Sequence, residues 1–207
     1  MVSPDDAMGA DTAFSYRCTR CNSCCVDKRI QVNPYEIARL ARHRGLSTGD
    51  LRDRFTVDGA LRQEADGRCA FLGEQGCTVH ADRPLVCRLF PLGRVVNSDG
   101  TERFVRFPDP HAAHGLFGSD GTIADYLATQ GAAPFIAAAD AYFQFYCRAS
   151  ERLANDEAPV ADTDGSDLLD IDSQLAAYCR EQQIEEPADP DERMRLHIRI
   201  LDAFLGE

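Results

Sequence analysis

The chain has 207 residues, a length typical of one ordinary domain with appended helices. Its 34 acidic residues outnumber the 22 basic residues, and the net charge of −12 argues against a protein that binds nucleic acid through the phosphate backbone. No run approaches 18 apolar residues, so we expect no membrane-spanning helix. The first six residues show neither the basic nor the apolar part of a secretory signal, which predicts a cytoplasmic protein.

Nine cysteines are a high number for a chain of this length. In a reducing compartment, clustered cysteines indicate metal or redox chemistry more than a disulfide framework. Residues 17–106 contain seven of the nine and carry 16 basic against 11 acidic residues. Thiolates around a metal keep a net negative charge, which nearby arginines would offset. The arginines that could do so, or that could simply be solvated surface residues, are Arg17, Arg20, Arg29, Arg68, Arg83 and Arg88.

A pair of helices is predicted directly after the first cysteines. The first begins at Pro34, because Asn33 is a cap residue and Glu36 completes a capping box. Gly45 ends this helix, and Ser47 opens a second, shorter one. The two helices are therefore an insertion between two groups of cysteines.

The second group of cysteines lies among very short elements. Residues 69–77 are typical of two short strands around a glycine turn, and Pro84 is predicted to start one helical turn that ends in Cys87. Residues 92–96 and 103–107 are joined through Asn97-Ser98-Asp99-Gly100, which predicts a β-hairpin.

From residue 122 onward the chain is predicted to be helical. Thr122 caps a helix that Gly131 ends, and Pro134 opens a longer one. The longer helix carries a stripe that we expect to face the core, made of Phe135, Ala138, Ala139, Tyr142, Tyr146, Ala149 and Leu153. Asp189 caps a terminal helix that is expected to pack through Met194, Ile198, Leu201 and Leu205.

These elements predict an α+β fold that is mostly helical. Cysteine turns and a small β-hairpin form an irregular centre organised by metal, and the downstream helices pack against it. We expect a flexible N-terminal tail over residues 1–15 and a single metal-binding domain over residues 16–207. Its parts are a cysteine-rich core (16–107) and a helical cover (108–207) with an exposed acidic linker (155–172).

The pattern Cys-x2-Cys-x2-Cys-Cys begins at Cys18 and is a specific signal for metal binding. A spacing of two residues lets a tight turn aim two thiolates at one metal. Neighbouring Cβ atoms diverge, so one of the adjacent Cys24 and Cys25 is expected to serve a different atom. Seven clustered thiols exceed the four that one zinc ion or one cubane cluster needs, which leaves two sites or one multinuclear site open. Buried free thiols that act as small hydrophobes would not require this spacing.

The motifs of this region are Cys18-x2-Cys21-x2-Cys24-Cys25, Cys69-Ala-Phe-Leu, Cys77-Thr-Val-His and Arg83-Pro84-x2-Cys87-Arg88-x-Phe90-Pro91. Over residues 16 to about 92 they resemble the YkgJ-type CxxCxxCC family, described as zinc- or iron-chelating proteins, some with iron-sulfur clusters. Relatives have a further Cys-x-Gly in the loop before the first downstream helix, where this chain has His111-Ala-Ala-His114-Gly115. Histidine can replace cysteine at zinc and at Rieske-type iron. The resemblance therefore implies His114 as the eighth ligand and His111 as the second candidate.

The predicted metal ligands are Cys18, Cys21, Cys24, Cys25, Cys69, Cys77, Cys87 and His114. Cys147 and Cys179 lie in helical patterns far from other cysteines, where we expect buried free thiols. The resemblance implies that His80 packs where relatives have an aromatic residue. His43 and His197 are predicted to lie on helix surfaces.

Three functions stay open, because the sequence shows no nucleotide-binding loop and no acyl-transfer motif. The first is an iron-sulfur or other iron protein with a redox or electron-transfer role. The second is a zinc-stabilised module that binds an unidentified protein partner. The third is a metalloenzyme with an open metal position, which the replacement of cysteine by histidine would suit.

Overall fold

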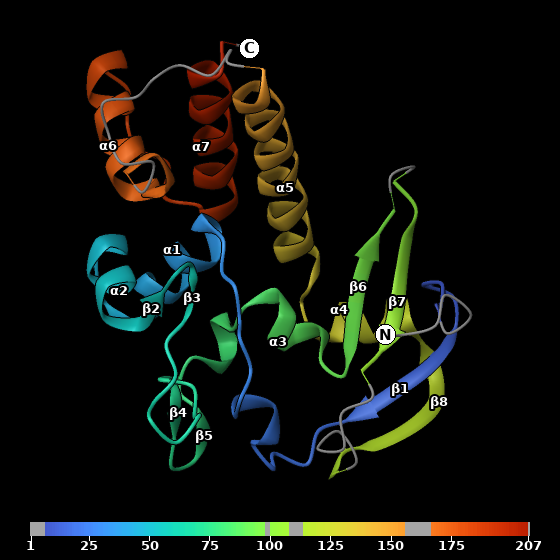
Figure 1. The fold of residues 1–207 in the computed structure, drawn as a ribbon. Helices are drawn as coiled ribbons and strands as arrows, with labels where there is room; N and C mark the ends of the chain where they lie inside the picture. The colour runs from blue at the N-terminus through green and yellow to red at the C-terminus, as the bar shows by residue number, and fades with distance from the viewer. Residues whose placement is uncertain (1–6, 98–99, 108–113, 156–166, 207) are drawn as a thin grey trace. The chain divides into compact units, whose positions relative to one another are not determined.

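The computed structural model describes residues 7–97, 100–107, 114–155 and 167–206 (Figure 1). Contacts divide the chain into two compact units. Unit 1 comprises residues 1–30 and 62–133, and unit 2 comprises residues 31–61 and 134–207. These units differ from the predicted parts of the chain, since the inserted helix pair belongs to unit 2 and residues 108–133 belong to unit 1. The division at residue 107 stays a prediction. In the described ranges, no helix is long and apolar enough to cross a membrane.

Unit 1 consists of short antiparallel strand pairs, β1 with β8, β4 with β5, and β6 with β7, joined by short helices. The predicted hairpin of residues 92–96 and 103–107 is confirmed with a shift of one residue in its second strand. The elements of unit 1 are β1 (Ala13–Arg17), η2 (Ser23–Cys25), β4 (Leu72–Gly73), β5 (Gly76–Cys77), η3 (His80–Asp82), α3 (Leu85–Leu89), β6 (Leu92–Val96), β7 (Glu102–Arg106), β8 (Leu116–Thr122) and α4 (Ile123–Thr129).

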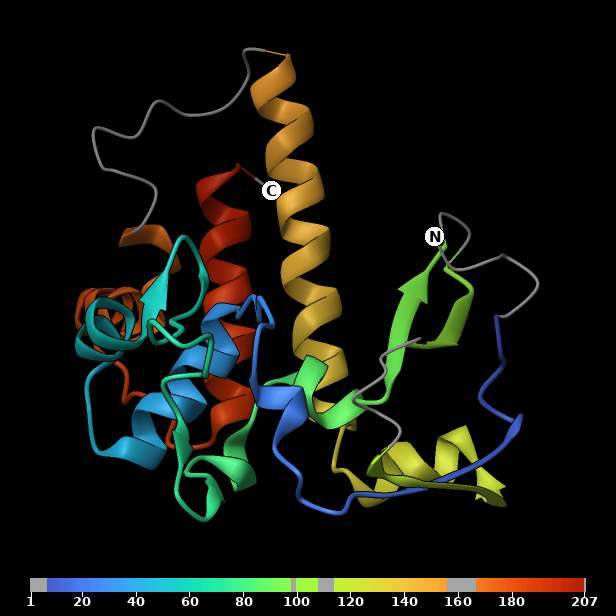
Figure 2. The same cartoon turned by 60° about the horizontal axis from the view of Figure 1, so that its bottom comes forward.

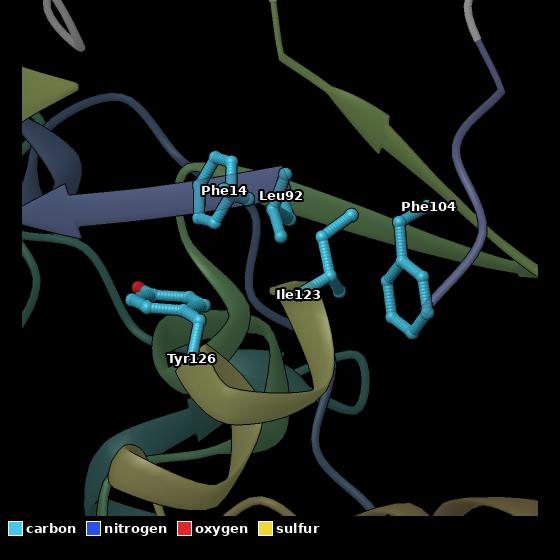
Figure 3. Close-up of a cluster of buried hydrophobic side chains, with 5 residues drawn as sticks. All are labelled: Phe14, Leu92, Phe104, Ile123 and Tyr126. Atoms are coloured by element: carbon cyan, nitrogen blue, oxygen red, sulfur yellow. The ribbon is translucent and has the colours of Figure 1, made fainter. Parts of the chain in front are cut away.

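The core of unit 1 joins strands that are far apart in the sequence (Figure 3). Phe14 of β1, Leu92 of β6 and Phe104 of β7 pack against Ile123 and Tyr126 of α4. The rings of Phe14 and Tyr126 meet edge to face, with centroids 5.2 Å apart. Burying each such side chain contributes about 1.5–3 kcal/mol. This apolar cluster fixes β1 and α4 relative to the hairpin β6–β7.

The predicted flexible tail is wrong for the described residues 7–15. Phe14 is only 6% exposed, and the backbone of Met8 exchanges two hydrogen bonds with Phe104, of 2.7 and 2.8 Å. The apolar side chains of Phe14 and Met8 anchor this segment of otherwise small and acidic residues. The edge of the hairpin β6–β7 also offers backbone hydrogen-bond partners. Residues 1–6 lie outside the described residues.

Unit 2 is built mainly from helices, and its capping signals are confirmed. Asn33 and Glu36 form a capping box at α1, Gly45 follows its last residue with a φ of 64°, and Ser47 caps α2. The elements of unit 2 are α1 (Pro34–Arg44), α2 (Thr48–Phe55), β2 (Thr56–Val57), β3 (Ala60–Leu61), α5 (Ala133–Ala154), η5 (Asp167–Leu169), α6 (Ile171–Gln182) and α7 (Pro190–Phe204).

Helices α6 and α7 lie side by side in both views of the molecule (Figure 1, Figure 2). Leu175 and Cys179 of α6 pack against Leu196 of α7. Asp170 caps α6 and accepts a hydrogen bond from the Thr48 hydroxyl. The predicted linker 155–172 therefore extends too far, because its last residues cap and begin α6. Residues 156–166 of the predicted linker lie outside the described residues.

The predicted core stripe of α5 is correct only in its first half. Phe135 and Tyr142 are 1% exposed, whereas Leu153 is 66% exposed and Tyr146 is 40% exposed. Phe145 is buried in place of Tyr146. The buried residues follow one another at intervals of three, four and three positions, whereas the predicted stripe continued from Tyr142 by four positions to Tyr146. Helices α5, α6 and α7 belong to unit 2, so their packing against the cysteine-rich centre stays a prediction.

His197 of α7 is fully buried, so the prediction of a surface position is wrong. It lies three residues after Met194 and four before Leu201, on the same buried stripe. Its Nδ1 lies 2.8 Å from the Tyr142 hydroxyl and its Nε2 lies 2.9 Å from the Leu168 carbonyl. His43 is exposed on α1, as predicted.

Candidate metal centre

All seven clustered cysteines belong to unit 1, and the two remaining cysteines belong to unit 2. Cys179 is 2% exposed in the core of unit 2, as expected of a buried free thiol. Cys147 is exposed on α5, so the prediction that it is buried is wrong. The separation by unit agrees with the separation by motif that the sequence predicted.

Backbone hydrogen bonds tie the two cysteine groups together. The N–H of Cys69 donates to the carbonyl of Cys25 over 2.8 Å, and Val26 pairs with Arg68 in an isolated antiparallel bridge. The N–H of Asp27 donates to the carbonyl of Gly67 over 2.9 Å. The chain thus returns from the helix pair of unit 2 to the place where it left the first cysteine group.

Three of the cysteines share one local geometry, in which the sulfur accepts a hydrogen bond from the backbone N–H two residues later. The N–H of Arg20 lies 3.3 Å from the Cys18 sulfur, and Arg20 has a φ of 58° in this turn. The N–H of Phe71 bonds to Cys69 and that of Val79 bonds to Cys77, and each bond favours the thiolate over the thiol. At Cys69 and Cys77 this effect opposes the larger effect of burial.

Cys24 and Cys25 direct their sulfur atoms toward each other, and the two atoms are 3.9 Å apart. Two thiolates at about 2.3 Å from a tetrahedral zinc would have sulfurs about 3.8 Å apart. The pair is therefore close enough to share one ion, and the expectation that its side chains diverge is wrong. The reason is the tight η2 turn, which follows Asn22 in a left-handed conformation.

The remaining thiols of the centre are half-buried and interact through their charges. The hydrogen bond with Cys24, burial, and the charges of Cys24, Cys77 and Cys87 raise the pKa of Cys25. Burial likewise raises the pKa of Cys69 and Cys77, and the charge of Cys24 adds to this at both residues. Thiolates crowded in this way need a cation to stay ionised together.

The thiols converge without forming a complete set of ligands. Throughout the described parts of the chain, no three side chains of His, Cys, Asp or Glu are arranged to hold a metal ion. The donors themselves suit zinc or iron, since they are cysteines outside any disulfide, and backbone N–H groups bond to three of the sulfurs.

Two of the arginines that could offset thiolate charge, Arg83 and Arg88, lie in the second cysteine group. The Arg83 guanidinium lowers the pKa of Cys77 against the larger effect of burial. Arg88 is 6% exposed, and it donates from Nε to the Arg83 carbonyl over 2.9 Å and from Nη1 to the Gln130 carbonyl over 2.7 Å. Through these hydrogen bonds, Arg88 links the segment between Cys77 and Cys87 to the end of α4. Arg68, by contrast, is exposed and pairs with Asp66.

His114 is exposed, and its backbone lies beside the first cysteine turn. Strand β1 pairs with β8 as far as Arg17, which faces Leu116. The Thr19 hydroxyl donates to the His114 carbonyl over 2.7 Å, between Cys18 and Cys21. His111 lies outside the described residues.

Tyr16 borders the same turn, and sequence reasoning missed it. Its ring packs against Phe117, with centroids 4.9 Å apart, and against Phe90, at 6.3 Å. Burial raises the pKa of Tyr16 to about 12, and the charges of Cys18, Cys21 and Cys24 act in the same direction. The only signal in the sequence is an aromatic residue two positions before the first cysteine.

His80 is exposed at η3 and does not fill a packed position, so that expectation is wrong. Arg83 donates from Nη1 to the His80 carbonyl over 2.6 Å and lies 3.2 Å from its Nδ1. Burial lowers the pKa of His80, and the charges of Arg83, Arg20 and Arg88 lower it further. A cationic neighbourhood of this kind disfavours a protonated histidine.

A cavity of about 440 Å³ lies beside Cys69 in unit 1. It combines charged and apolar side chains, and its lining residues are Glu64, Ala65, Asp66, Arg68, Cys69, Ala70 and Leu72. One of the predicted ligands therefore lies at a space that a small molecule could enter.

The sequence from residue 17 to residue 107 matches the family CxxCxxCC, described as "Putative zinc- or iron-chelating domain". Residues 17–107 are similar to this family, and we refer to this stretch as the CxxCxxCC domain. The resemblance found in the sequence is confirmed, and it supports a metal-binding role for the chain. The CxxCxxCC domain includes both cysteine groups and the hairpin β6–β7, and it ends before His114. No curated protein and no solved structure matches the chain.

Proposed function

We propose that the CxxCxxCC domain holds iron in an iron-sulfur cluster or another multinuclear thiolate site with a redox or electron-transfer role. Its proposed ligands are Cys18, Cys21, Cys24, Cys25, Cys69, Cys77, Cys87 and His114. Seven thiols in one compact unit support more than a single mononuclear site, because four close one tetrahedral ion.

One observation carries the proposal, namely the repeated hydrogen bond from backbone N–H to cysteine sulfur. It occurs at Cys18 in the first group and at Cys69 and Cys77 in the second. The N–H···S bond stabilises negative charge on sulfur, which a thiol in an ordinary core does not require. Its presence in both groups, joined by the bond from Cys69 to Cys25, supports one shared centre.

His114 is proposed as the ligand that completes the centre. The hydrogen bond from Thr19 holds its backbone next to the loop between Cys18 and Cys21. A neutral imidazole in place of a thiolate would make the site less negative by one charge, which favours the reduced state of an iron centre.

The bound metal would supply the electron-accepting centre, and the residues around it would set its charge and its access. Arg88 is held by backbone carbonyls within unit 1, and Arg83 lies close enough to affect Cys77. Arg83 would offset part of the negative charge of the thiolates. The cavity beside Cys69 would give small molecules or water access to one edge of the centre.

A zinc-stabilised interaction module is the second candidate, and the size of the local elements favours it. Strands β4 and β5 have two residues each, and η2 and η3 have three. Elements this short supply little folding free energy of their own, which a structural metal would provide. The cavity next to Cys69 is the one observation that favours the third candidate, a metalloenzyme whose metal keeps an open coordination position.

The deciding experiment measures metal in the full chain after purification without oxygen. We expect iron, with or without acid-labile sulfide, and Cys21→Ser and His114→Ala should each reduce the amount bound. Cys147→Ser is the matched control, because this exposed cysteine lies in unit 2, and it should leave the amount of metal per chain unchanged.

Stoichiometric zinc without iron would replace the redox role with the interaction module. Loss of metal in Cys147→Ser, or full metal in Cys21→Ser, would contradict the proposed ligand set. Full metal with unchanged spectra in His114→Ala would restrict the ligands to the seven cysteines.

A further inference from the structure

We propose that the hydroxyl of Tyr16 donates a hydrogen bond to a metal-bound thiolate of the Cys18–Cys24 turn. Tyr16 would thereby act as a positioning residue that adjusts the electron density on the sulfur atoms. The inference rests on the proposed metal site, and it adds a residue that the family motif does not include.

Tyr16 lies two residues before the first cysteine. Strand β1 ends at Arg17, one residue before Cys18. Side chains two positions apart leave an extended strand on the same face, so Tyr16 is placed on the face toward which a continued strand would direct Cys18. The Cys18 sulfur already accepts the N–H of Arg20, and a thiolate sulfur can accept further donors.

Tyr16 is wedged in place by the strand that faces it. A Cβ atom added to Gly115 would lie 2.1 Å from Cε2 of Tyr16 and 2.2 Å from its hydroxyl oxygen. Phe117 and Phe90 pack against the same ring. Gly115 is thus required for space, and the phenol has little freedom to turn away from the cysteine turn.

The Tyr16 hydroxyl has no hydrogen bond to any described residue, whereas the hydroxyl of Tyr126 donates to the Phe90 carbonyl over 2.6 Å. A half-buried phenol needs an acceptor, and thiolates are the acceptors that the sequence places next to it. After burial, the charges of Cys18, Cys21 and Cys24 also raise the pKa of Tyr16.

A hydrogen bond to a metal-bound thiolate withdraws electron density from sulfur. It raises the reduction potential of an iron centre and moves thiolate-to-metal charge-transfer absorption to higher energy. Loss of the phenol hydroxyl should shift both quantities in the opposite direction without removing a ligand. A merely structural tyrosine would not produce this shift.

The test uses the full chain, freed of metal under reducing conditions and titrated anaerobically with Co2+ as the spectroscopic probe. Tyr16→Phe should bind as many equivalents of Co2+ as the wild type, with its charge-transfer band shifted to lower energy. Tyr126→Phe is the matched control, because it removes a phenol hydroxyl that is already bonded within the same unit, and its band should not move. Gly115→Ala retains the phenol but displaces it, so it should reproduce the shift and also decides the matter if Tyr16→Phe does not fold.

Each outcome has one meaning. A Tyr16→Phe band identical to that of the wild type at full Co2+ binding overturns the hydrogen bond and leaves the metal site intact. Equal shifts in Tyr16→Phe and Tyr126→Phe also overturn it, because they reveal a general loss of packing. A wild-type chain that binds no Co2+ contradicts the proposed function itself, and the role of Tyr16 fails with it.

Discussion

At the scale of single residues, His197 shows how a buried polar side chain fixes its own chemistry. A carbonyl can only accept a hydrogen bond, so Nε2 of His197 must carry the hydrogen that bonds to the Leu168 carbonyl. Nδ1 is then the acceptor for the Tyr142 hydroxyl. Both nitrogens of the neutral ring are satisfied, and protonation would break the bond with Tyr142 unless its hydroxyl reoriented.

The stability of unit 2 should depend on pH through His197. Burial lowers the pKa of His197 to about 4, against the opposing effects of the Leu168 carbonyl and the Asp170 charge. The unfolded chain binds a proton below its ordinary pKa of 6.5 while the folded chain does not, so the free energy of unfolding falls as pH decreases from about 6.5 to about 4. The full effect is about 3 kcal/mol.

Urea unfolding at several pH values between 7 and 4 measures this slope. His197→Gln should lose the part of the slope that histidine contributes, and His43→Gln, a change at an exposed position, is the control. Equal slopes in the wild type and His197→Gln would rule out the buried neutral histidine.

The roles of individual residues were predictable only where the signal is local. Cysteine spacing indicated the candidate thiols of the proposed centre, because a turn of two residues has a fixed reach. Tyr16 and His197 were missed, since each depends on partners about 100 and about 55 residues away along the chain, Gly115 and Tyr142. Helical periodicity shows on which face of a helix a histidine lies, but it does not show which segment packs against that face.

At the scale of elements, the caps were the most predictable features. Asn33, Thr122 and Asp189 each accept a backbone N–H from the first turn of the helix that they cap. Such bonds are formed within four residues, so the sequence contains both partners. Strand β8 was not predicted, because its partner β1 lies about 100 residues earlier and its own residues, Leu-Phe-Gly-Ser-Asp-Gly-Thr, have low strand propensity.

Removal of the cap of α4 should destabilise unit 1 by about 1 kcal/mol. The Thr122 hydroxyl accepts the N–H of Asp125 over 3.2 Å and donates to its carboxylate over 2.8 Å. Thr122→Ala loses both bonds, whereas Thr122→Ser keeps the hydroxyl and should remain near the wild type. Chemical denaturation of the three proteins measures the difference, and equal losses in both variants would contradict the capping role.

At the scale of the whole molecule, the chain passes between its two units three times, after residues 30, 61 and 133. Sequence reasoning placed one domain over residues 16–207 and did not assign the inserted helices to a unit of their own with the C-terminal helices. The reason is that hydrophobic periodicity shows that a helix is buried without showing against which segment. The Tyr35 and Phe135 rings, with centroids 5.4 Å apart, make this connection inside unit 2.

Metal removal should loosen unit 1 around the cysteines. Crowded thiolates without a cation repel or take up protons, and the two-residue strands of this region have few backbone bonds to resist. In the chelated, reduced protein, the amides of Asp27, Cys69 and Thr78 should exchange faster than in the metal-loaded protein. The amides of the hairpin β6–β7, which the apolar core of unit 1 holds in place, serve as the internal control and should keep their protection.

The exchange returns to its slow rate on addition of the metal if the proposed centre organises this region. Unchanged protection of the three amides after complete chelation would show that the turns fold without metal.

The bridge between Val26 and Arg68 closes a long loop of the chain. The chain between Cys25 and Cys69 is a loop of about 45 residues whose ends meet at this bridge, and it includes the helices α1 and α2 of unit 2. An ion held by a thiol at each end would act as a reversible cross-link. By restricting the unfolded chain, it would stabilise the folded loop by on the order of 4 kcal/mol. Occupancy of the metal centre would therefore set how easily the helices of the other unit unfold, although they contribute no ligand to it.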